Sequence, residues 1–215
     1  MRGVPWWGVV SSAASPVLMV GGWTIAAMLQ PPSFNPVADT VSSLAASGAP
    51  DRWVMTLVFL AVGFCGVVTG IALGPAAPAG RLLLIAGALA GMMVALNPEH
   101  ARAGSVSHAV WASLAFAGLG SWSAGSWRRG RSVPWGLRPA ACLGAVAVQL
   151  ILLAWFVTEL VTAAKQVGLA ERAVGAGTSR RAASSATRWH SSTACNAWIH
   201  AISFPVTRDP AGSAE

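Results

Sequence analysis

The sequence predicts an all-α protein, a polytopic bundle of transmembrane helices with a cytoplasmic N-terminus. Of its 215 residues, 54% are hydrophobic and only 10% are charged, whereas a soluble domain is about 25% charged. Charge-free apolar stretches recur along the chain, and about 20 such residues span a bilayer core. The basic residues gather in alternate loops. Together these features exclude an ordinary soluble enzyme and a disordered chain.

Five helices are expected, each between charged residues that bracket an apolar stretch. The first stretch is longer than the apolar core of a signal peptide and contains Pro16, which favours an uncleaved helix over a cleaved leader. Arg81 can lengthen the third and shortest helix by reaching toward the headgroups. The expected helices are Gly8–Leu29, Trp53–Gly74, Arg81–Leu96, His108–Trp127 and Pro139–Thr158.

The arginines predict the orientation, because Lys and Arg concentrate in cytoplasmic loops. The net charge of +7 is then a sign of topology and not of nucleic-acid binding, and membrane lipids are the expected partners. The alternative for the arginine cluster is binding of anionic headgroups. The cytoplasmic side would carry Arg2, Arg81, Arg128, Arg129, Arg131 and Arg138, and the outer side Asp39, Asp51, Arg52, Glu99, Arg102 and Glu159.

Small residues predict how the helices pack, since lipid supplies no hydrophobic drive between them. Gly66, Gly70 and Gly74 recur at four-residue spacing on the second helix, and Gly87 and Gly91 lie on the third. We expect these two helices to form an antiparallel hairpin across the short loop that joins them. The alternative is a homo-oligomer seam through Gly66, Gly70 and Gly74.

The cysteines and histidines predict neither a metal site nor a cofactor. Cys65 and Cys142 fall inside apolar helices and Cys195 in the tail, which argues against a disulfide framework and gives no zinc spacing. Only His100 and His108 lie in the helical body. A haem held by paired histidines, or a zinc held by three, is therefore not expected.

The loop after the first helix predicts a short interfacial helix over residues Thr40–Ser47. Asp39 is a suitable N-cap and Gly48 a suitable C-terminal stop, while Val41 and Leu44 would face the bundle. By the same reasoning, Asp51 would cap the second helix and Ser107 the fourth.

Alternate loops bring polar residues to the outer face, where carboxylates beside an imidazole could form an acid–base pair, a cation site or a polar pocket. Each residue also has a purely structural interpretation as a cap, a loop charge or a helix-end marker. The candidates are Asp39, Asn97, Glu99, His108 and Glu159.

The stretch Asp39–Thr56, with Pro98 and His108, resembles a bacterial membrane family catalogued as domain of unknown function 998. The resemblance covers about Pro5–Ala176. It implies six helices and a multi-pass location in the cell (inner) membrane, and it brings no established activity. It also implies that Ser42 belongs to the outer-face site with Asp39 and His108, and it adds Glu171 and Arg172 as candidate members.

The chain departs from the family pattern after Ala176, where a sixth apolar helix is expected. The sequence predicts a helical bundle over residues 1–176 and an atypical polar tail over residues 177–215, disordered or produced by a shifted reading frame. Translation of the other frames tests the second idea, which fails if none yields an apolar 20-mer.

Three functions remain open from the sequence. The favoured one is a non-enzymatic membrane protein that binds a lipid or small molecule, or supports the envelope. The first alternative is a membrane-embedded enzyme with His108 as base and Asp39 or Glu159 as partner. The second is a small transporter, which is weakened because no acidic residue lies in the middle of a predicted helix.

Overall fold

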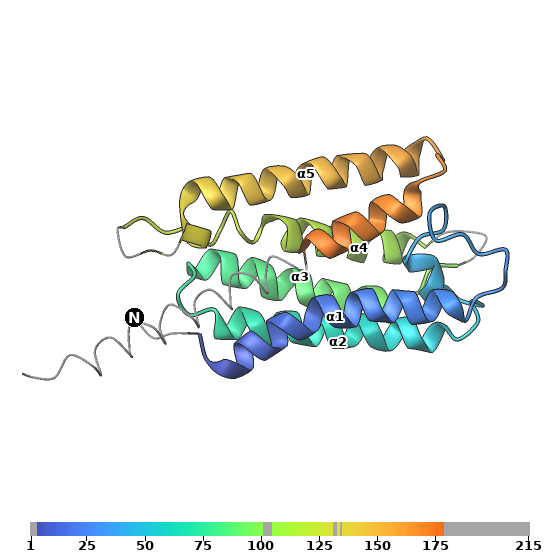
Figure 1. Ribbon diagram of the computed structural model, residues 1–215, viewed down its shortest axis with the longest axis horizontal. Helices are drawn as coiled ribbons and strands as arrows, with labels where there is room; N and C mark the ends of the chain where they lie inside the picture. Colours follow the sequence, from blue (N-terminus) through green and yellow to red (C-terminus); the bar gives the residue numbers. More distant parts are fainter. Residues whose placement is uncertain (1–3, 101–104, 131–132, 134, 179–215) are drawn as a thin grey trace, which may run out of the picture.

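The computed structural model describes residues 4–100, 105–130, 133 and 135–178, and this part of the chain is helical and without strands (Figure 1). Two short 3₁₀ turns, η1 (Ser42–Ala45) and η2 (Trp135–Leu137), accompany the long helices. A further helix covers residues 167–178. The long helices are α1 (Trp6–Met28), α2 (Arg52–Ala72), α3 (Pro78–Leu96), α4 (Val106–Ser121) and α5 (Pro139–Val161).

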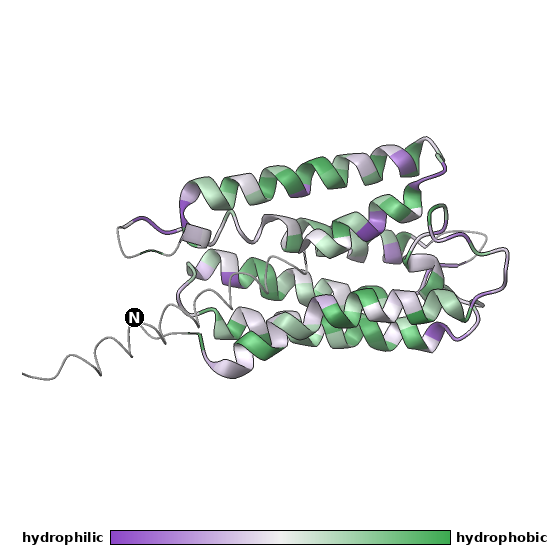
Figure 2. Cartoon of the chain, viewed as in Figure 1, coloured by the Kyte–Doolittle hydropathy of each residue, from purple (hydrophilic) through white to green (hydrophobic). Residues whose placement is uncertain are grey.

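The five predicted helices are all present, so the fold class is confirmed. Among the described residues, α1, α2, α3 and α5 are long and apolar enough to cross a membrane. Figure 2 shows apolar residues over much of their length, and many large side chains on them are exposed, including Ile151 at 68% and Leu82 at 65%. Several long apolar helices with exposed apolar faces indicate a multi-pass membrane protein.

The fourth helix is shorter than predicted, because α4 ends at Ser121 and not at Trp127. The chain beyond it turns back onto the start of α3, where the Gly80 amide donates to the Gly125 carbonyl over 2.9 Å. A Cβ on Gly80 would lie 1.9 Å from Ser126 Oγ. The segment after α4 thus packs closely on the start of α3.

Glycines lie where neighbouring helices approach most closely, as predicted for the α2–α3 hairpin. A Cβ on Gly66 would lie 2.7 Å from Ala88 Cβ, and one on Gly70 would lie 2.5 Å from Ile85 Cγ1. Gly87 packs instead against Gly118 of α4, and Gly74 has no atom within 4 Å of its Cβ position. Because Gly66 and Gly70 already serve contacts within the chain, self-association through this seam stays a prediction.

The helix over residues 167–178 was not among the five predicted helices, and it closes the ring of helices. It packs on α1, where a Cβ on Gly175 would lie 3.4 Å from Met19 Cε, and on α5, where one on Gly177 would lie 3.3 Å from Leu152 Cδ1. Ala170 and Val174 are fully buried in this contact. The predicted boundary at residue 176 therefore falls inside a helix, and residues 179–215 lie outside the described part of the chain.

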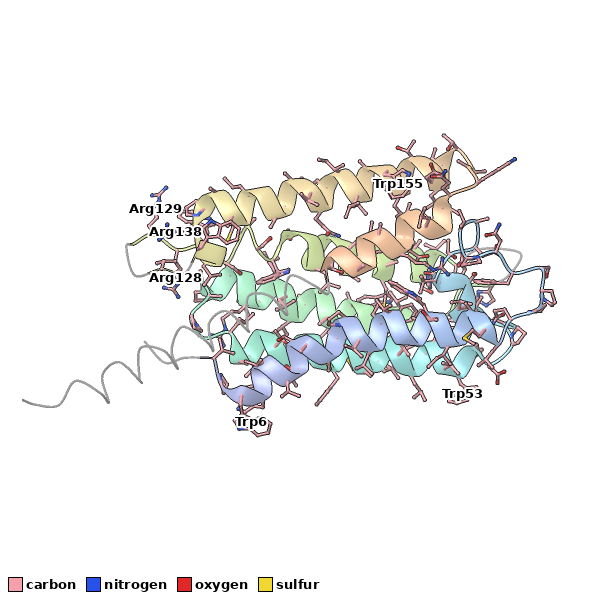
Figure 3. All side chains as sticks on the ribbon, in the orientation of Figure 1. Trp6, Trp53, Arg128, Arg129, Arg138 and Trp155 are labelled. Atoms are coloured by element: carbon pink, nitrogen blue, oxygen red, sulfur yellow. The ribbon has the colours of Figure 1, made fainter. Side chains whose placement is uncertain are left out.

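The bundle has two chemically distinct ends (Figure 3). The basic end carries Arg128, Arg129 and Arg138, together with Trp6, which is 69% exposed. The acidic end is formed by the loop between α1 and α2, residues 97–100, and the turn after α5, with Trp53 and Trp155 beside it. Tryptophans at both ends are typical of the two interfaces of a membrane. Of the predicted outer-side and cytoplasmic arginines, Arg2, Arg102 and Arg131 lie outside the described residues, as do Cys195, His190 and His200.

Candidate functional site

Glu171 is the centre of the acidic end, where it joins the 167–178 helix to the loop between α1 and α2. One carboxylate oxygen, Oε1, accepts a hydrogen bond of 2.8 Å from Ser42 Oγ, and Oε2 accepts a short one from the Val41 amide. The side chain is only 8% exposed. A buried carboxyl of this kind has to be held by donors, because its burial removes the water that would otherwise solvate it.

Arg172 holds the same loop from the other side. Its Nη1 donates to the main-chain carbonyls of Pro36, Asp39 and Gly168, at 2.5, 2.9 and 3.0 Å. Its Nη2 is buried and has no hydrogen-bond partner within the described residues. The guanidinium therefore points to the loop backbone, and Glu171 and Arg172 together form what we term the outer lock.

Glycine 168 allows the outer lock to close. A Cβ at this position would lie 2.1 Å from the Asp39 carbonyl oxygen, a distance that no side chain tolerates. The neighbouring Leu169 amide donates to the Val37 carbonyl over 3.0 Å. The main chain at the start of the 167–178 helix therefore lies directly against the main chain of the loop between α1 and α2, with no side chain between them.

Burial shifts the pKa of both charged residues of the outer lock, which lie outside the four candidate spans. Burial raises the pKa of the Glu171 carboxyl, while the hydrogen bonds from Ser42 and Val41 and the charge of Arg172 lower it. Burial also lowers the pKa of the Arg172 guanidinium, against the charges of Glu171 and Asp39. Desolvation is the larger effect in both residues, so the ionised carboxyl lacks the solvation that it has in water.

The predicted interfacial helix is present only as the single turn η1, and its cap is not Asp39. Asp39 Oδ2 instead accepts from the Asn35 amide over 2.7 Å, and Thr40 Oγ1 accepts from the Ser43 amide over 3.0 Å. Asp39 is bound within its own loop because the chain turns at residues 35–39 before η1 begins. Val41 and Leu44 are each 1% exposed, which confirms their predicted direction toward the bundle.

The caps predicted for α2 and α4 are also wrong. Asp51 has a left-handed backbone, with φ of 47°, and makes no side-chain cap; its carboxylate accepts from Trp53 Nε1 over 3.1 Å. Ser105, not Ser107, caps α4 by accepting from the His108 amide over 3.3 Å. The helix starts two residues before His108, so the capping hydroxyl lies correspondingly earlier.

Asn97 and His108, both sequence-predicted candidates, lie together. The His108 Nδ1 donates to the Asn97 main-chain carbonyl over 3.0 Å, and the ring is only 8% exposed. Within the described residues, the ring has no hydrogen bond to a carboxylate. Glu99 instead uses its main-chain carbonyl, which accepts from the Ser47 amide over 2.8 Å. The loop after η1 is therefore joined to the segment after α3 through the main chain. The His108 imidazole binds the same segment at Asn97.

Glu159 serves the turn after α5. Its two carboxylate oxygens accept from Trp155 Nε1, over 3.2 Å, and from the Gln166 amide, over 3.0 Å. The six predicted site residues therefore share one end of the bundle without forming one hydrogen-bonded cluster. Ser42 and the Asp39 carbonyl contact the outer lock, and Asn97 pairs with His108. Glu99 binds the Ser47 amide, and Glu159 binds within the turn after α5.

A cavity of about 130 Å³ lies inside the bundle and reaches the outer lock. Its walls come from α1, α2, α3, α4 and the 167–178 helix. Most of the lining is apolar, and Glu171 and Ser42 supply its polar end beside Val41. The other lining residues that bear hydroxyls are Ser15, Thr69 and Thr178.

Sequence reasoning missed Gln149, the one amide inside the α5 stretch. Gln149 is 2% exposed, and its Nε2 donates to the Val174 carbonyl over 3.3 Å. Its Oε1 is buried without a partner among the described residues. A lone polar residue in an apolar helix is the signal that could have identified this contact.

The described residues contain no group of three His, Cys, Asp or Glu that could hold a metal ion. Cys65 and Cys142 are buried free thiols. No hydrogen-bonded constellation in this part of the chain therefore suggests a metal or a thiol chemistry, and the outer lock with its cavity is the feature that could bind a ligand.

One of three comparisons with known proteins gives a match. The model of the family described as "Protein of unknown function (DUF998)" matches residues 12–179. No curated protein and no solved structure matches the chain. Since the match covers most of the chain, the protein belongs to the DUF998 family, and its last matched residue lies just beyond the 167–178 helix.

Proposed function

We propose that this protein is a non-enzymatic membrane protein that binds a lipid-like small molecule inside its helical bundle. The observation that carries the proposal is the cavity of about 130 Å³ between four helices and the 167–178 helix. A protein cavity of about 150 Å³ holds one benzene molecule. The cavity therefore suits one ring or a short length of hydrocarbon chain.

The contacts of His108 favour binding over catalysis. A general base needs a partner that orients it and a reacting group within reach. The His108 ring is buried against the Asn97 carbonyl, and Asp39 and Glu159, its proposed partners, are bound within their own loops. The one buried carboxylate near the cavity, Glu171, is separate from the imidazole in the hydrogen-bond network.

The location that we propose is the plasma membrane, with the basic end in the cytoplasm. The arginines at that end, Arg81, Arg128, Arg129 and Arg138, support this orientation by the positive-inside rule. Reporter fusions at Gly130 and at Ser33, which lie at opposite ends of the bundle, test it. A cytoplasmic signal from the Ser33 fusion would contradict the orientation.

A cavity-filling variant tests ligand binding. Gly91 lines the cavity, and its Cβ position has no atom within 4 Å, so Gly91→Leu places a side chain in the open space. Gly144 is an exposed glycine of α5 with the same free Cβ position, and Gly144→Leu is the matched control. The probe is toluene, measured by ligand-observed NMR on protein in nanodiscs, with empty nanodiscs as background.

We expect saturable toluene binding by the unmodified protein and by Gly144→Leu, and its loss in Gly91→Leu. The proposal is wrong if the unmodified protein gives no signal above empty nanodiscs, or if Gly91→Leu binds toluene as well as Gly144→Leu does.

A further inference from the structure

The cavity has an acid and no base on its wall. Among the described residues that line it, Glu171 is the single charged side chain. Arg172, the neighbouring cation, directs its Nη1 to three loop carbonyls and is absent from that lining. The polar end of the cavity is therefore a carboxyl whose nearest basic neighbour is turned to the loop.

The Glu171 carboxylate can accept a further hydrogen bond. A carboxylate has about four lone-pair sites in all. Glu171 uses three of them for the Ser42 hydroxyl and the main-chain amides of Val41 and Ser42. One further donor can therefore be accommodated. Because Glu171 is 8% exposed, water supplies little of this, and a donor from a ligand would replace the missing hydration.

From this geometry we infer that the bound molecule presents a hydrogen-bond donor, a hydroxyl or an ammonium group, to Glu171 and that anionic amphiphiles are excluded. The inference rests on the proposed binding function and specifies its ligand class. The apolar body of the molecule occupies the space lined by Phe59, Val62 and Phe116, and its polar group lies beside Ser42. An acid in the same place would bring two like charges together where solvent does not separate them, which disfavours the ionised form of one.

Three probes that share one ring and differ in charge test the inference. Benzylamine and benzyl alcohol carry a donor, and benzoate carries an anion on a ring that the cavity volume admits. Dissociation constants are measured in nanodiscs at neutral pH by ligand-observed NMR, with competition by toluene to show that each probe occupies the same cavity. Empty nanodiscs give the correction for partition into lipid.

We expect benzylamine and benzyl alcohol to bind the unmodified protein about tenfold more tightly than benzoate, since a hydrogen bond to a charged group is among the stronger ones. Equal or tighter binding of benzoate overturns the inference. If toluene binds while the donor probes do no better than benzoate, the donor inference is wrong and the proposed function stands. If toluene itself does not bind, the proposed function is wrong.

Two variants separate the charge from the fold. Glu171→Gln removes the charge and should abolish the preference for benzylamine over benzoate, with toluene binding as the check that the cavity is intact. Ser42→Ala keeps the carboxylate, removes one of its internal donors, and should retain the preference. A preference that persists in Glu171→Gln with toluene binding unchanged overturns the assignment of Glu171 as the acceptor.

Discussion

Ser42 and Glu171, 129 positions apart in the chain, are joined by a hydrogen bond of 2.8 Å between the serine hydroxyl and the carboxylate. With the bond from the Val41 amide, it ties the loop after α1 to the 167–178 helix. Because the same carboxylate also lines the cavity, one side chain both closes the acidic end and forms the polar wall of the candidate ligand site.

Glu171→Ala should destabilise the protein by about 1–3 kcal/mol, because it leaves the buried Val41 amide without an acceptor. Ser42→Ala should cost less, about 0.5–1.5 kcal/mol, since it removes one hydrogen bond and leaves the carboxylate its main-chain donors. Reversible unfolding in mixed detergent micelles gives the two free energies. A larger loss from Ser42→Ala than from Glu171→Ala would mean that the carboxylate is not the centre of the outer lock.

Gly168→Ala should separate the 167–178 helix from the loop, because the new Cβ would meet the Asp39 carbonyl oxygen at 2.1 Å. Both atoms belong to the backbone or are fixed to it, so relief requires a shift of the whole helix start, at about 1–3 kcal/mol. Gly144→Ala, at an unobstructed position, is the control and should be neutral or slightly stabilising. Protease accessibility of the loop reports the separation, and equal digestion of the two variants would contradict it.

Gln149→Leu should be tolerated within about 1 kcal/mol. It removes the bond to the Val174 carbonyl but also the buried Oε1 that has no partner in the described residues, and the apolar replacement fills a similar volume. Gln149→Ala, by contrast, opens a void between α5 and the 167–178 helix and should cost about 2 kcal/mol or more. If Leu is as damaging as Ala in unfolding experiments, the amide itself is required.

Benzylamine binding should tighten as the pH rises. Burial raises the pKa of Glu171, so the carboxyl stays neutral to a higher pH than an exposed glutamate, and an ammonium group binds the ionised form better. Affinity therefore increases until Glu171 is ionised, by at most tenfold per pH unit for a single proton. The groups around the carboxyl are Ser42, Val41, Arg172 and Asp39, and Glu171→Gln should give a flat profile. A pH dependence that survives in that variant would assign it to another group.

Apolar composition and bracketing charges sufficed to predict the five long helices, since spanning a membrane constrains length and polarity so strongly. The end of α4 was not predictable from apolarity, because the apolar run continues through Trp122. Beyond Ser121 the chain turns so that Ser126 lies against Gly80, a contact between segments distant in sequence. The carboxylates of Asp39 and Asp51 accept from other nearby groups, the Asn35 amide and the Trp53 indole, so neither caps the helix that follows it.

The candidate site was predictable in its location and only partly in its partners. Alternating loops place Asp39, Ser42, Asn97, Glu99, His108 and Glu159 at one end, but loops alone do not tell which of them meet. Glu171 and Arg172 entered through the family resemblance, without partners; in the structure Glu171 accepts from Ser42, and Arg172 donates to the Asp39 carbonyl. The cavity could not be predicted, because it depends on the open space beside Gly91 and on residues from six elements: α1, η1, α2, α3, α4 and the 167–178 helix.

The contact between Val41 and Glu171 spans 130 positions, which has a consequence for biosynthesis. During translation the loop after α1 is made long before the helix that satisfies its buried amide, so the acidic end stays open while α2 to α5 insert. The loop between α1 and α2 therefore reaches its final structure only after the 167–178 helix has been made. Ribosome-bound chains truncated before Gly168 should leave that loop accessible to modifying reagents, and chains that extend well beyond Arg172 should protect it.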